Sequence, residues 1–302
     1  MRNAVFVLAT AALVAGCGSS TPHRRATPTA RLDFAYDAST PLEYVDRGRV
    51  NTPAPLAIHD VSFTSGDKRI DGYLVLPPGS GRRPAVVFMP GTGGDRSELL
   101  AKAGWLAARN VVTLTITPPA PSTAPGGAYE LLTRIRTETA AQVVAVRRAV
   151  DVLHSLPSVD PNRIGYVGWS AGARIGTLVA ATDPRIRAFV LLSAGATPVS
   201  AYVVQAAAPL RAQVRRVLES VDPIRYVALA RPTSLLLEDG RKDEVVPRPA
   251  LENVVRAAPK GTTVRWYDAP HALNRAAYHD AYDWLAHRLP IRGPRVPGAE
   301  TA

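Results

Sequence analysis

Between residues 58 and 289, short apolar runs alternate with longer segments whose apolar residues recur at helical spacing. This alternation constrains the fold most, because strands separated by helices pair in parallel and need helices on both faces of the sheet. The first two runs are joined by Ser65-Gly66-Asp67, which is typical of an antiparallel hairpin at one edge. We therefore expect an α/β fold with a mostly parallel sheet. The expected strands cover 58–63, 70–76, 85–89, 111–116, 164–167, 188–192, 234–237 and 263–266, and the expected helices cover 98–109, 132–153, 171–181, 200–220, 248–257 and 274–288.

The start of the chain has the pattern of an export signal. Arg2 precedes an apolar run over 4–15, which is too short to span a bilayer and ends in the residues VAGC at 14–17. This ending resembles the lipobox of bacterial lipoproteins, whose cysteine is acylated and becomes the new N-terminus. Cys17 is the only cysteine in the chain, so it cannot form an internal disulfide. We expect lipidation of Cys17, for example with palmitate, and a lipid-anchored place on the extracytoplasmic face of the cell membrane. The alternative is an ordinary signal peptide whose removal discards Cys17.

Composition divides the chain into four parts. Residues 1–17 form the expected lipoprotein signal peptide. Residues 18–55 begin with a stretch rich in Ser, Thr, Pro and Arg without periodicity, which indicates a flexible tether and N-terminal extension. Residues 56–290 form the α/β body, in which 195–226 leave room for a small cap at most. The Pro- and Gly-rich residues 291–302 indicate a loose C-terminal tail.

A serine between two glycines follows the strand expected over 164–167, in the stretch Gly168-Trp169-Ser170-Ala171-Gly172. The stretch matches the pattern G-x-S-x-G, and a helical segment of small residues comes directly after it. In such a strand–turn–helix the serine hydroxyl stands clear of the sheet, and the first N–H groups of the helix point to the same place. A tight turn that merely contains a serine is the alternative. A serine hydroxyl is a poor nucleophile without a base, so a catalytic reading requires partners elsewhere.

Two later strands are followed by residues that could activate Ser170. Asp243 lies in the charged turn after the strand expected over 234–237, and His271 follows the strand expected over 263–266. Ligands of open α/β sheets bind at the carboxyl ends of the strands, where all three residues would lie. Glu238, Asp239 and Asp268 are the alternatives for the acid, and Asp268 is too close to His271 in sequence to orient its ring.

These motifs together resemble the α/β-hydrolase superfamily over residues 58–289, and within it the dienelactone-hydrolase-like and prolyl-oligopeptidase-like serine esterases. The resemblance rests on four stretches, which are FMPGTGG at 88–94, GWSAG at 168–172, 237–247 with Asp243, and APH at 269–271. Many relatives have a histidine where this chain has Pro90, and dienelactone hydrolases themselves use a cysteine nucleophile. The serine favours ordinary ester chemistry.

The resemblance implies a role for each of these residues. Ser170 would be the nucleophile, His271 the general base and acid, and Asp243 the group that holds the imidazole. The backbone N–H groups of Ala171 and Thr92 would form the oxyanion hole.

Other classes of function have little support. The net charge is +11, but the basic residues are scattered rather than gathered in a stripe with interleaved aromatic residues, which argues against nucleic-acid binding. No H-E-x-x-H, cysteine pair, EF-hand loop or P-loop occurs, so we expect no metal and no cofactor. The other histidines fall in the tether, the first strand or helices, where they are more simply structural or solvated.

The sequence thus predicts a membrane-anchored, secreted serine hydrolase that acts on a small ester or other acyl substrate through an acyl-enzyme. Carboxylesterase activity is the first hypothesis. A peptidase, thioesterase or acyltransferase would use the same residues, and a non-catalytic lipoprotein could use the same fold for binding.

Overall fold

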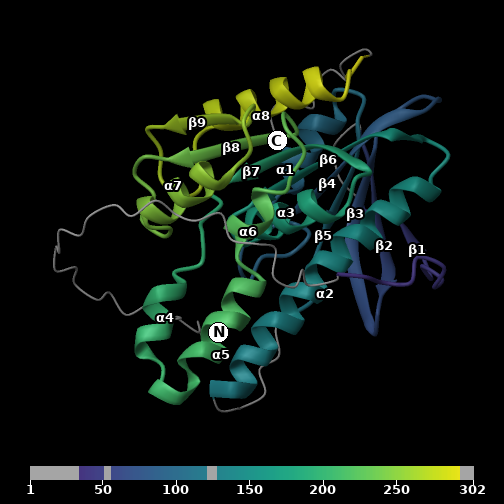
Figure 1. Ribbon diagram of the computed structural model, residues 1–302. Coiled ribbons are helices and arrows are strands. Elements are labelled where there is room, and N and C mark those ends of the chain that lie inside the picture. Colours follow the sequence, from purple (N-terminus) through teal and green to yellow (C-terminus); the bar gives the residue numbers. More distant parts are fainter. Residues whose placement is uncertain (1–33, 51–55, 121–127, 293–302) are drawn as a thin grey trace, which may run out of the picture. The chain divides into compact units, whose positions relative to one another are not determined.

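A computed structural model describes residues 34–50, 56–120 and 128–292 (Figure 1). Its centre is one sheet, which in the described part of the chain has nine strands in the order β1-β2-β3-β5-β4-β6-β7-β8-β9. Neighbours from β5 to β9 pair in parallel, whereas β1, β2, β3 and β5 pair antiparallel with one another in that order. The strands are β1 (Val45–Arg49), β2 (Ala57–Ser65), β3 (Lys68–Leu76), β4 (Arg83–Met89), β5 (Val112–Ile116), β6 (Val159–Trp169), β7 (Ile186–Leu192), β8 (Leu235–Gly240) and β9 (Thr263–Tyr267).

Helices cover both faces of the sheet, as the alternation of apolar runs predicts. One face packs against α1 and α8 in a core that includes Phe88, Leu106 and Leu285. The other face packs against α2, α3, α6 and α7 in a larger core. The helices are α1 (Leu100–Ala107), α2 (Ala128–Ser155), α3 (Ala171–Thr182), α4 (Val199–Gln205), α5 (Arg211–Ser220), α6 (Pro223–Val227), α7 (Arg248–Ala257) and α8 (Arg275–Arg288), with a 3₁₀ turn at Ala208–Leu210. The predicted α/β class, edge hairpin and two helical layers are therefore confirmed.

The segment 34–50 lies inside the range for which the sequence predicts a tether and extension, yet it packs closely onto the body. Phe34 is buried in the larger core, and its carbonyl accepts a hydrogen bond from Arg147 on α2 (2.6 Å). Arg148, also on α2, donates to the carbonyls of Thr40 and Pro41. Strand β1 then adds to the edge of the hairpin. The packed part of the chain therefore includes residues 34–50 as well as 56–120 and 128–292.

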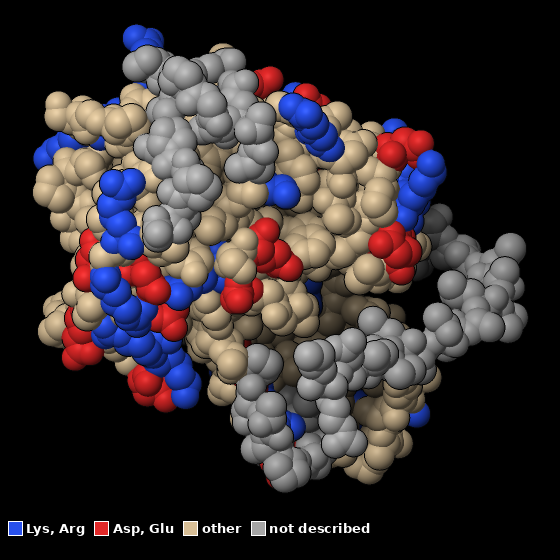
Figure 2. All heavy atoms as spheres, turned by 180° about the vertical axis from the view of Figure 1, so that it is seen from behind, with Lys and Arg blue, Asp and Glu red and all other residues tan. Residues whose placement is uncertain are grey.

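A small helical insertion follows β7, where the sequence leaves room for a small cap. Its helices α4 and α5 have their own apolar cluster, built on Val203, Val214 and Leu218, which also contacts Ile135 on α2. Figure 2 shows a hollow between this insertion and the remainder of the body. The insertion thus lies on the side of the sheet where the parallel strands end, since it follows the carboxyl end of β7.

No helix in the described residues is both long enough and apolar enough to cross a bilayer.

Candidate active site

The turn between β6 and α3 holds Ser170 in an unusual backbone conformation. Its φ of 54° and ψ of −113° lie outside the regions that non-glycine residues commonly adopt, which costs about 1–3 kcal/mol. Three hydrogen bonds hold the turn, from Ser170 N to the Leu192 carbonyl (2.8 Å), from Gly172 N to the Pro90 carbonyl (3.0 Å), and from the Tyr166 hydroxyl to the Gly172 carbonyl (2.7 Å). The neighbouring strands β4 and β7 therefore determine where the serine stands.

The two glycines of this turn are required by close packing of backbone. A Cβ at Gly168 would lie 2.5 Å from the Gly172 carbonyl carbon, and one at Gly172 would lie 2.2 Å from the Met89 carbonyl oxygen. Both distances are far below van der Waals contact, so neither position accepts a side chain without movement of the main chain. Close backbone packing on both sides of Ser170 thus explains why both positions are glycine.

The structure brings the three predicted side chains together at this turn. His271 Nε2 lies 2.9 Å from Ser170 Oγ, and His271 Nδ1 lies 2.8 Å from Asp243 Oδ2. The imidazole and the carboxylate are both almost fully buried. Asp243 Oδ1 accepts hydrogen bonds from the N–H groups of Val245 and Val246, which fix the carboxylate in the turn after β8. A hydroxyl, an imidazole and a carboxylate thus form one hydrogen-bonded chain.

The three alternative acids lie elsewhere and have other surroundings. The Glu238 side chain accepts a hydrogen bond from the Tyr267 hydroxyl (2.9 Å), and Asp268 pairs with Lys242 at the surface. Asp239 is buried, and within the described residues it makes no hydrogen bond to His271.

Two of these carboxyl groups have strongly perturbed pKa values. Burial raises the pKa of Glu238 to about 8, and the hydrogen bond from Tyr267 opposes this only in part. Burial, together with the charge of Asp243, raises the pKa of Asp239 to about 7. At the carboxyl end of β8, Glu238 and Asp239 therefore hold protons near neutral pH. Asp243, in the turn that follows, is instead hydrogen-bonded to the imidazole.

The loop that carries His271 is held by residues that the sequence analysis missed. The backbone carbonyl oxygen of His271 accepts hydrogen bonds from Ser193 Oγ (3.0 Å) and from the Trp169 indole N–H (3.1 Å). The backbone N–H of His271 donates to Glu244 Oε2 (3.2 Å). Ser193 comes directly after β7, and a polar residue at the end of a parallel strand is a signal of a site residue that the sequence contained. Its backbone has a φ of 57°. The other two contacts depend on which loops meet, which no local pattern reveals.

The loop after β4 lies against the nucleophile. Gly91–Gly94 forms a turn closed by a hydrogen bond from Gly94 N to the Gly91 carbonyl (3.2 Å), with Gly93 at a φ of 75°. A Cβ at Gly91 would lie 3.5 Å from Ser170 Cβ, so little space separates the loop from the serine. Glu98 Oε2 accepts a hydrogen bond from Gly91 N (2.8 Å) and so ties this turn to the segment before α1.

The two predicted oxyanion-hole residues border this region. Ala171 is the first residue of α3, where N–H groups have no partner within the helix, and Thr92 is exposed in the turn after β4. Neither N–H donates a hydrogen bond to another described residue.

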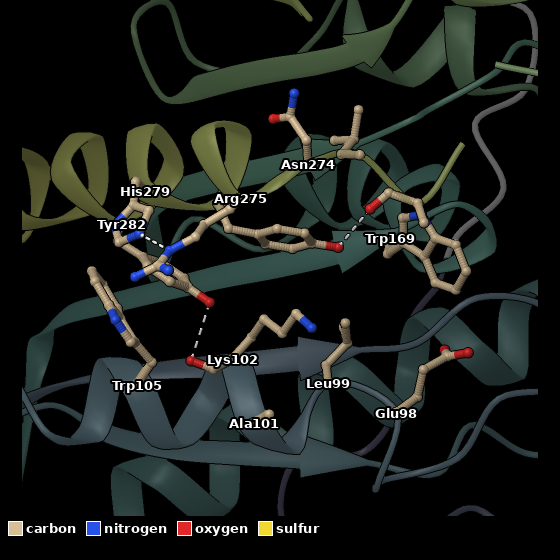
Figure 3. Close-up of a pocket in the computed structure, with 13 residues that line it drawn as sticks. Glu98, Leu99, Ala101, Lys102, Trp105, Trp169, Asn274, Arg275, His279 and Tyr282 are labelled. Atoms are coloured by element: carbon tan, nitrogen blue, oxygen red, sulfur yellow. Dashed lines mark hydrogen bonds between the residues drawn. The ribbon is translucent and has the colours of Figure 1, made fainter. Parts of the chain in front are cut away.

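A cavity of about 820 Å³ lies between α1 and α8, lined in part by Trp169 and Ala272, which are the chain neighbours of Ser170 and His271 (Figure 3). Trp169 and Glu98 stand at one end, and Trp105 and Tyr282 stand at the other, stacked on each other. Trp169 separates this cavity from His271, because its ring contacts the imidazole with centroids 5.3 Å apart. Ser170 itself does not line the cavity.

The remaining predicted features concern metals, the other histidines and the anchor. Within the described ranges, no three His, Cys, Asp or Glu side chains come together as a metal site. His59 pairs with Asp46 on the edge strands, and His279 accepts a hydrogen bond from Arg275 on α8. Cys17 and residues 1–17 lie outside the described residues.

Comparison with curated proteins finds relatives of moderate identity. The chain is 27% identical over 225 residues to the "Putative esterase NocK" of Nocardia uniformis subsp. tsuyamanensis, an alignment that covers 74% of this chain and 63% of that protein. It is 32% identical over 139 residues to the polyketide transferase ATR5 of Stachybotrys chlorohalonatus, covering 45% and 44% of the two chains. The chain therefore spans less than two thirds of the length of these relatives.

Among solved structures, acetyl xylan esterases have the same fold. The enzyme of Paenibacillus sp. R4 superposes with a TM-score of 0.69 at 19% identity, covering 82% of this chain and 89% of that one. Acetyl xylan esterase 1 of Thermoanaerobacterium sp. JW/SL YS485 gives a TM-score of 0.68 at 16% identity, covering 85% and 90%. These likenesses concern the fold.

A family model matches most of the folded body. The match covers residues 70–289, which include most of β3, all of β4 to β9, the turn at Ser170, and the loops that carry Asp243 and His271. The chain belongs to the dienelactone hydrolase family.

Proposed function

We propose that this member of the family hydrolyses carboxylic esters through an acyl-enzyme on Ser170. The observation that carries the proposal is the hydrogen-bonded chain from Ser170 Oγ to His271 Nε2 (2.9 Å) and from His271 Nδ1 to Asp243 Oδ2 (2.8 Å). A nucleophile, a base and a group that orients the base are the parts that nucleophilic acyl transfer requires. The strained turn that presents Ser170 supports the same role, since strain of this kind is concentrated at functional sites.

In the first half-reaction, Ser170 Oγ attacks the ester carbonyl carbon while its proton moves to His271 Nε2. The carbonyl oxygen becomes an oxyanion, which the N–H groups of Ala171 and Thr92 stabilise. Ala171 is suited to this role because it opens α3, where the helix dipole adds positive potential. When the bond to the leaving alkoxide breaks, His271 gives the proton to that oxygen, and the acyl group stays on Ser170.

In the second half-reaction, His271 accepts a proton from water, and the resulting hydroxide attacks the acyl carbon. The proton then returns from His271 to Ser170 Oγ as the acid product leaves. Asp243 acts throughout as the acceptor for Nδ1–H, so that Nε2 carries the lone pair in the resting state. The contacts to the His271 carbonyl from Ser193 and Trp169 hold the loop, so the imidazole keeps its distance from Ser170.

Purified full-length protein tests the proposal on 4-nitrophenyl acetate and butyrate. Ser170→Ala should lower kcat on the order of 10⁶-fold, by analogy with other serine triads. Ser220→Ala is a matched control, because among the described residues its hydroxyl bonds only to the Val217 carbonyl on α5. A fluorophosphonate should label the wild-type protein and the control but not Ser170→Ala. Equal ester hydrolysis by wild type and Ser170→Ala would refute the proposal.

Acyl transfer to an alcohol is the second candidate, because one relative is named a polyketide transferase. The same acyl-enzyme would then be attacked by an alcohol in place of water. Product analysis with added alcohol acceptors distinguishes the two, since a transferase gives new esters where a hydrolase gives the free acid.

We also propose that the protein is exported and anchored by lipid on Cys17. The support is the sequence of residues 1–17, with Arg2, the apolar run and the final cysteine. Two or more acyl chains, each stabilising binding by about 0.8 kcal/mol per buried CH₂, hold a protein stably in a bilayer. Labelled palmitate should enter the wild type but not Cys17→Ser. The absence of label from both would refute the anchor.

A further inference from the structure

The helical insertion after β7 has an unusual charge pattern. The segment 195–218, which includes α4 and most of α5, contains three arginines and no lysine, aspartate or glutamate. The arginines are Arg211, Arg215 and Arg216, all on α5, so α4 and the 3₁₀ turn after it carry no charged side chain. Ordinary protein surfaces mix charges of both signs. The insertion therefore consists of an uncharged helix beside a cationic one.

The uncharged part of the insertion exposes apolar side chains to solvent. Val204 on α4 is 71% exposed, which is the largest fraction among the large apolar residues of the described ranges, and Tyr202 is 47% exposed. The exposed residues 207–209 after α4 are Ala, Ala and Pro. Single exposed apolar residues are common, but a run of them without charge indicates a surface that contacts a partner.

The packing of the insertion keeps these side chains outside. Val203, Val214 and Leu218 form the apolar cluster between α4 and α5, so the inner faces of both helices already contact each other. Val204 lies about 100° further round the helix than Val203, which turns it away from that cluster. Figure 1 shows the two helices beside each other and away from the sheet. The outer face of α4 therefore stays open among the described residues.

The arginines of α5 lie close to this apolar face. Arg211 Nε donates to the Ala206 carbonyl (3.1 Å), and a terminal nitrogen of the same side chain donates to the Val204 carbonyl (3.4 Å). This guanidinium therefore stands at the carboxyl end of α4. The other two arginines follow one turn later and are exposed, and one of them contacts Glu219 at 3.7 Å. An apolar helical face bordered by cations is typical of segments that bind to the surface of a bilayer.

We propose that the outer face of α4, with the arginines of α5 beside it, docks on a bilayer that contains anionic lipids. Val204 would enter the boundary between headgroups and acyl chains. Tyr202 suits that boundary, because it has an apolar ring and a polar tip. The guanidinium groups would pair with lipid phosphates. A second copy of the chain fits this surface less well, because two such faces would bring both sets of arginines together.

This surface is connected to the edge of the sheet that carries the candidate active site. The insertion follows the carboxyl end of β7, where Ser193 donates to the His271 carbonyl (3.0 Å). The proposed anchor would act together with it, since a chain from Cys17 to Phe34 spans at most about 60 Å. The inference does not need the ester chemistry. It adds a second contact to the proposed anchor, and the test is made without that anchor so that the two can fail separately.

A dye placed on α4 of the full-length protein tests the docking. Cys17→Ser removes the lone native cysteine together with the proposed acylation site, so a cysteine introduced by Val204→Cys or Leu229→Cys is the only thiol. Leu229 is the control, because it is also exposed (46%) but lies between α6 and the amino end of β8. Each variant carries the environment-sensitive dye NBD and is mixed with vesicles of phosphatidylcholine, with or without phosphatidylglycerol.

With the anionic vesicles, the NBD emission of Val204→Cys should shift to shorter wavelength and be quenched by spin-labelled lipid, because the dye enters the apolar boundary. The emission of Leu229→Cys should stay unchanged. The apolar run over 4–15 could also bring the chain to vesicles, but it would not distinguish these two positions.

Charge is tested in the Val204→Cys protein. Arg215→Gln with Arg216→Gln should raise the lipid concentration at half-maximal response about 10–30-fold, because each arginine near an anionic surface strengthens binding about fivefold. Arg82→Gln with Arg187→Gln is the matched control, because these arginines are exposed near the amino ends of β4 and β7. It should leave the lipid concentration within about twofold of the parent.

Four outcomes would overturn the inference. They are equal dye responses at positions 204 and 229, equal responses to vesicles with and without phosphatidylglycerol, equal lipid requirements of the two arginine variants, and a response at position 204 that follows protein concentration in the absence of vesicles. The last outcome would identify a second copy of the chain as the partner. The proposed anchor is judged separately, by palmitate labelling of Cys17.

Discussion

Asp239 provides a quantitative test of the electrostatics around the site. The residue is 2% exposed at the end of β8, and burial beside Asp243 raises its pKa to about 7. Its ordinary value is 3.8. Since a raised pKa means that the folded state holds the proton more tightly than the unfolded state, Asp239 favours folding at low pH. That contribution is lost as the pH rises toward the pKa of the folded state.

The size of the effect follows from the two values. Between pH 5 and pH 7 the unfolded chain has largely released this proton and the folded protein has kept it. Each pH unit in that window changes the free energy of unfolding by about 1.4 kcal/mol. Between pH 5 and pH 8.5, the free energy of unfolding of the wild type should therefore fall by up to about 3 kcal/mol more than that of Asp239→Asn. Asn cannot ionise, and it has nearly the same size.

Urea denaturation at both pH values measures the difference. Asp239→Asn should be more stable than the wild type at pH 8.5, and its advantage should shrink at pH 5. Asp268→Asn is the control, because that carboxylate is exposed and ion-paired with Lys242. An Asp239→Asn variant with the same stability increment at both pH values would show that this carboxyl group is not held protonated by burial.

Three further predictions concern the residues that build the site. Asp243→Asn should lower kcat about 10⁴-fold in an ester assay, whereas Asp239→Asn should keep most of the activity. Thermal unfolding of both variants should stay cooperative, and comparable losses of activity would contradict the assignment of Asp243 as the acid. Gly172→Ala should lower the free energy of unfolding by about 3 kcal/mol in urea denaturation, because its Cβ would lie 2.2 Å from a backbone oxygen. Gly104→Ala is the control and should not destabilise the protein, because the nearest described atom, on Leu56, would lie 3.9 Å from its Cβ. Glu98→Ala should reduce kcat about 10-fold, because the hydrogen bond from Gly91 N is lost, and Glu98→Gln should restore the rate. Equal rates in the wild type and both variants would exclude a positioning role for Glu98.

The central strands could be predicted from sequence because they are buried on both faces. All seven residues of β4 are buried, for example, and its last five, Ala85–Met89, form the unbroken apolar run that the sequence analysis used. Strand β1 could not be predicted in this way. Its sequence is VDRGR, four of its five residues are exposed, and Arg47 pairs with Asp60 and Asp71 across the edge. An edge strand held by charges and backbone pairing lacks the apolar pattern on which prediction depends.

The same distinction applies to the site. Ser170, Asp243 and His271 each follow a strand in a recognisable motif, so the sequence was sufficient to place them at one edge of the sheet. Ser193 and Glu244 hold the main chain of His271, and Glu98 holds the turn after β4 at Gly91. Such contacts depend on the spacing of loops in three dimensions, and any polar residue in those loops could have made them.

The order of the parts along the chain has a consequence for biosynthesis. Ser170 is translated about a hundred residues before His271. The region after the histidine is also needed, since buried Leu289 beyond α8 packs against β6 at Gly165, where a Cβ would lie 2.9 Å from Leu289 Cδ1. A nascent polypeptide that still lacks this final segment carries an alcohol with no proton acceptor. Under the proposed function, ester hydrolysis through Ser170 would therefore require a nearly complete chain.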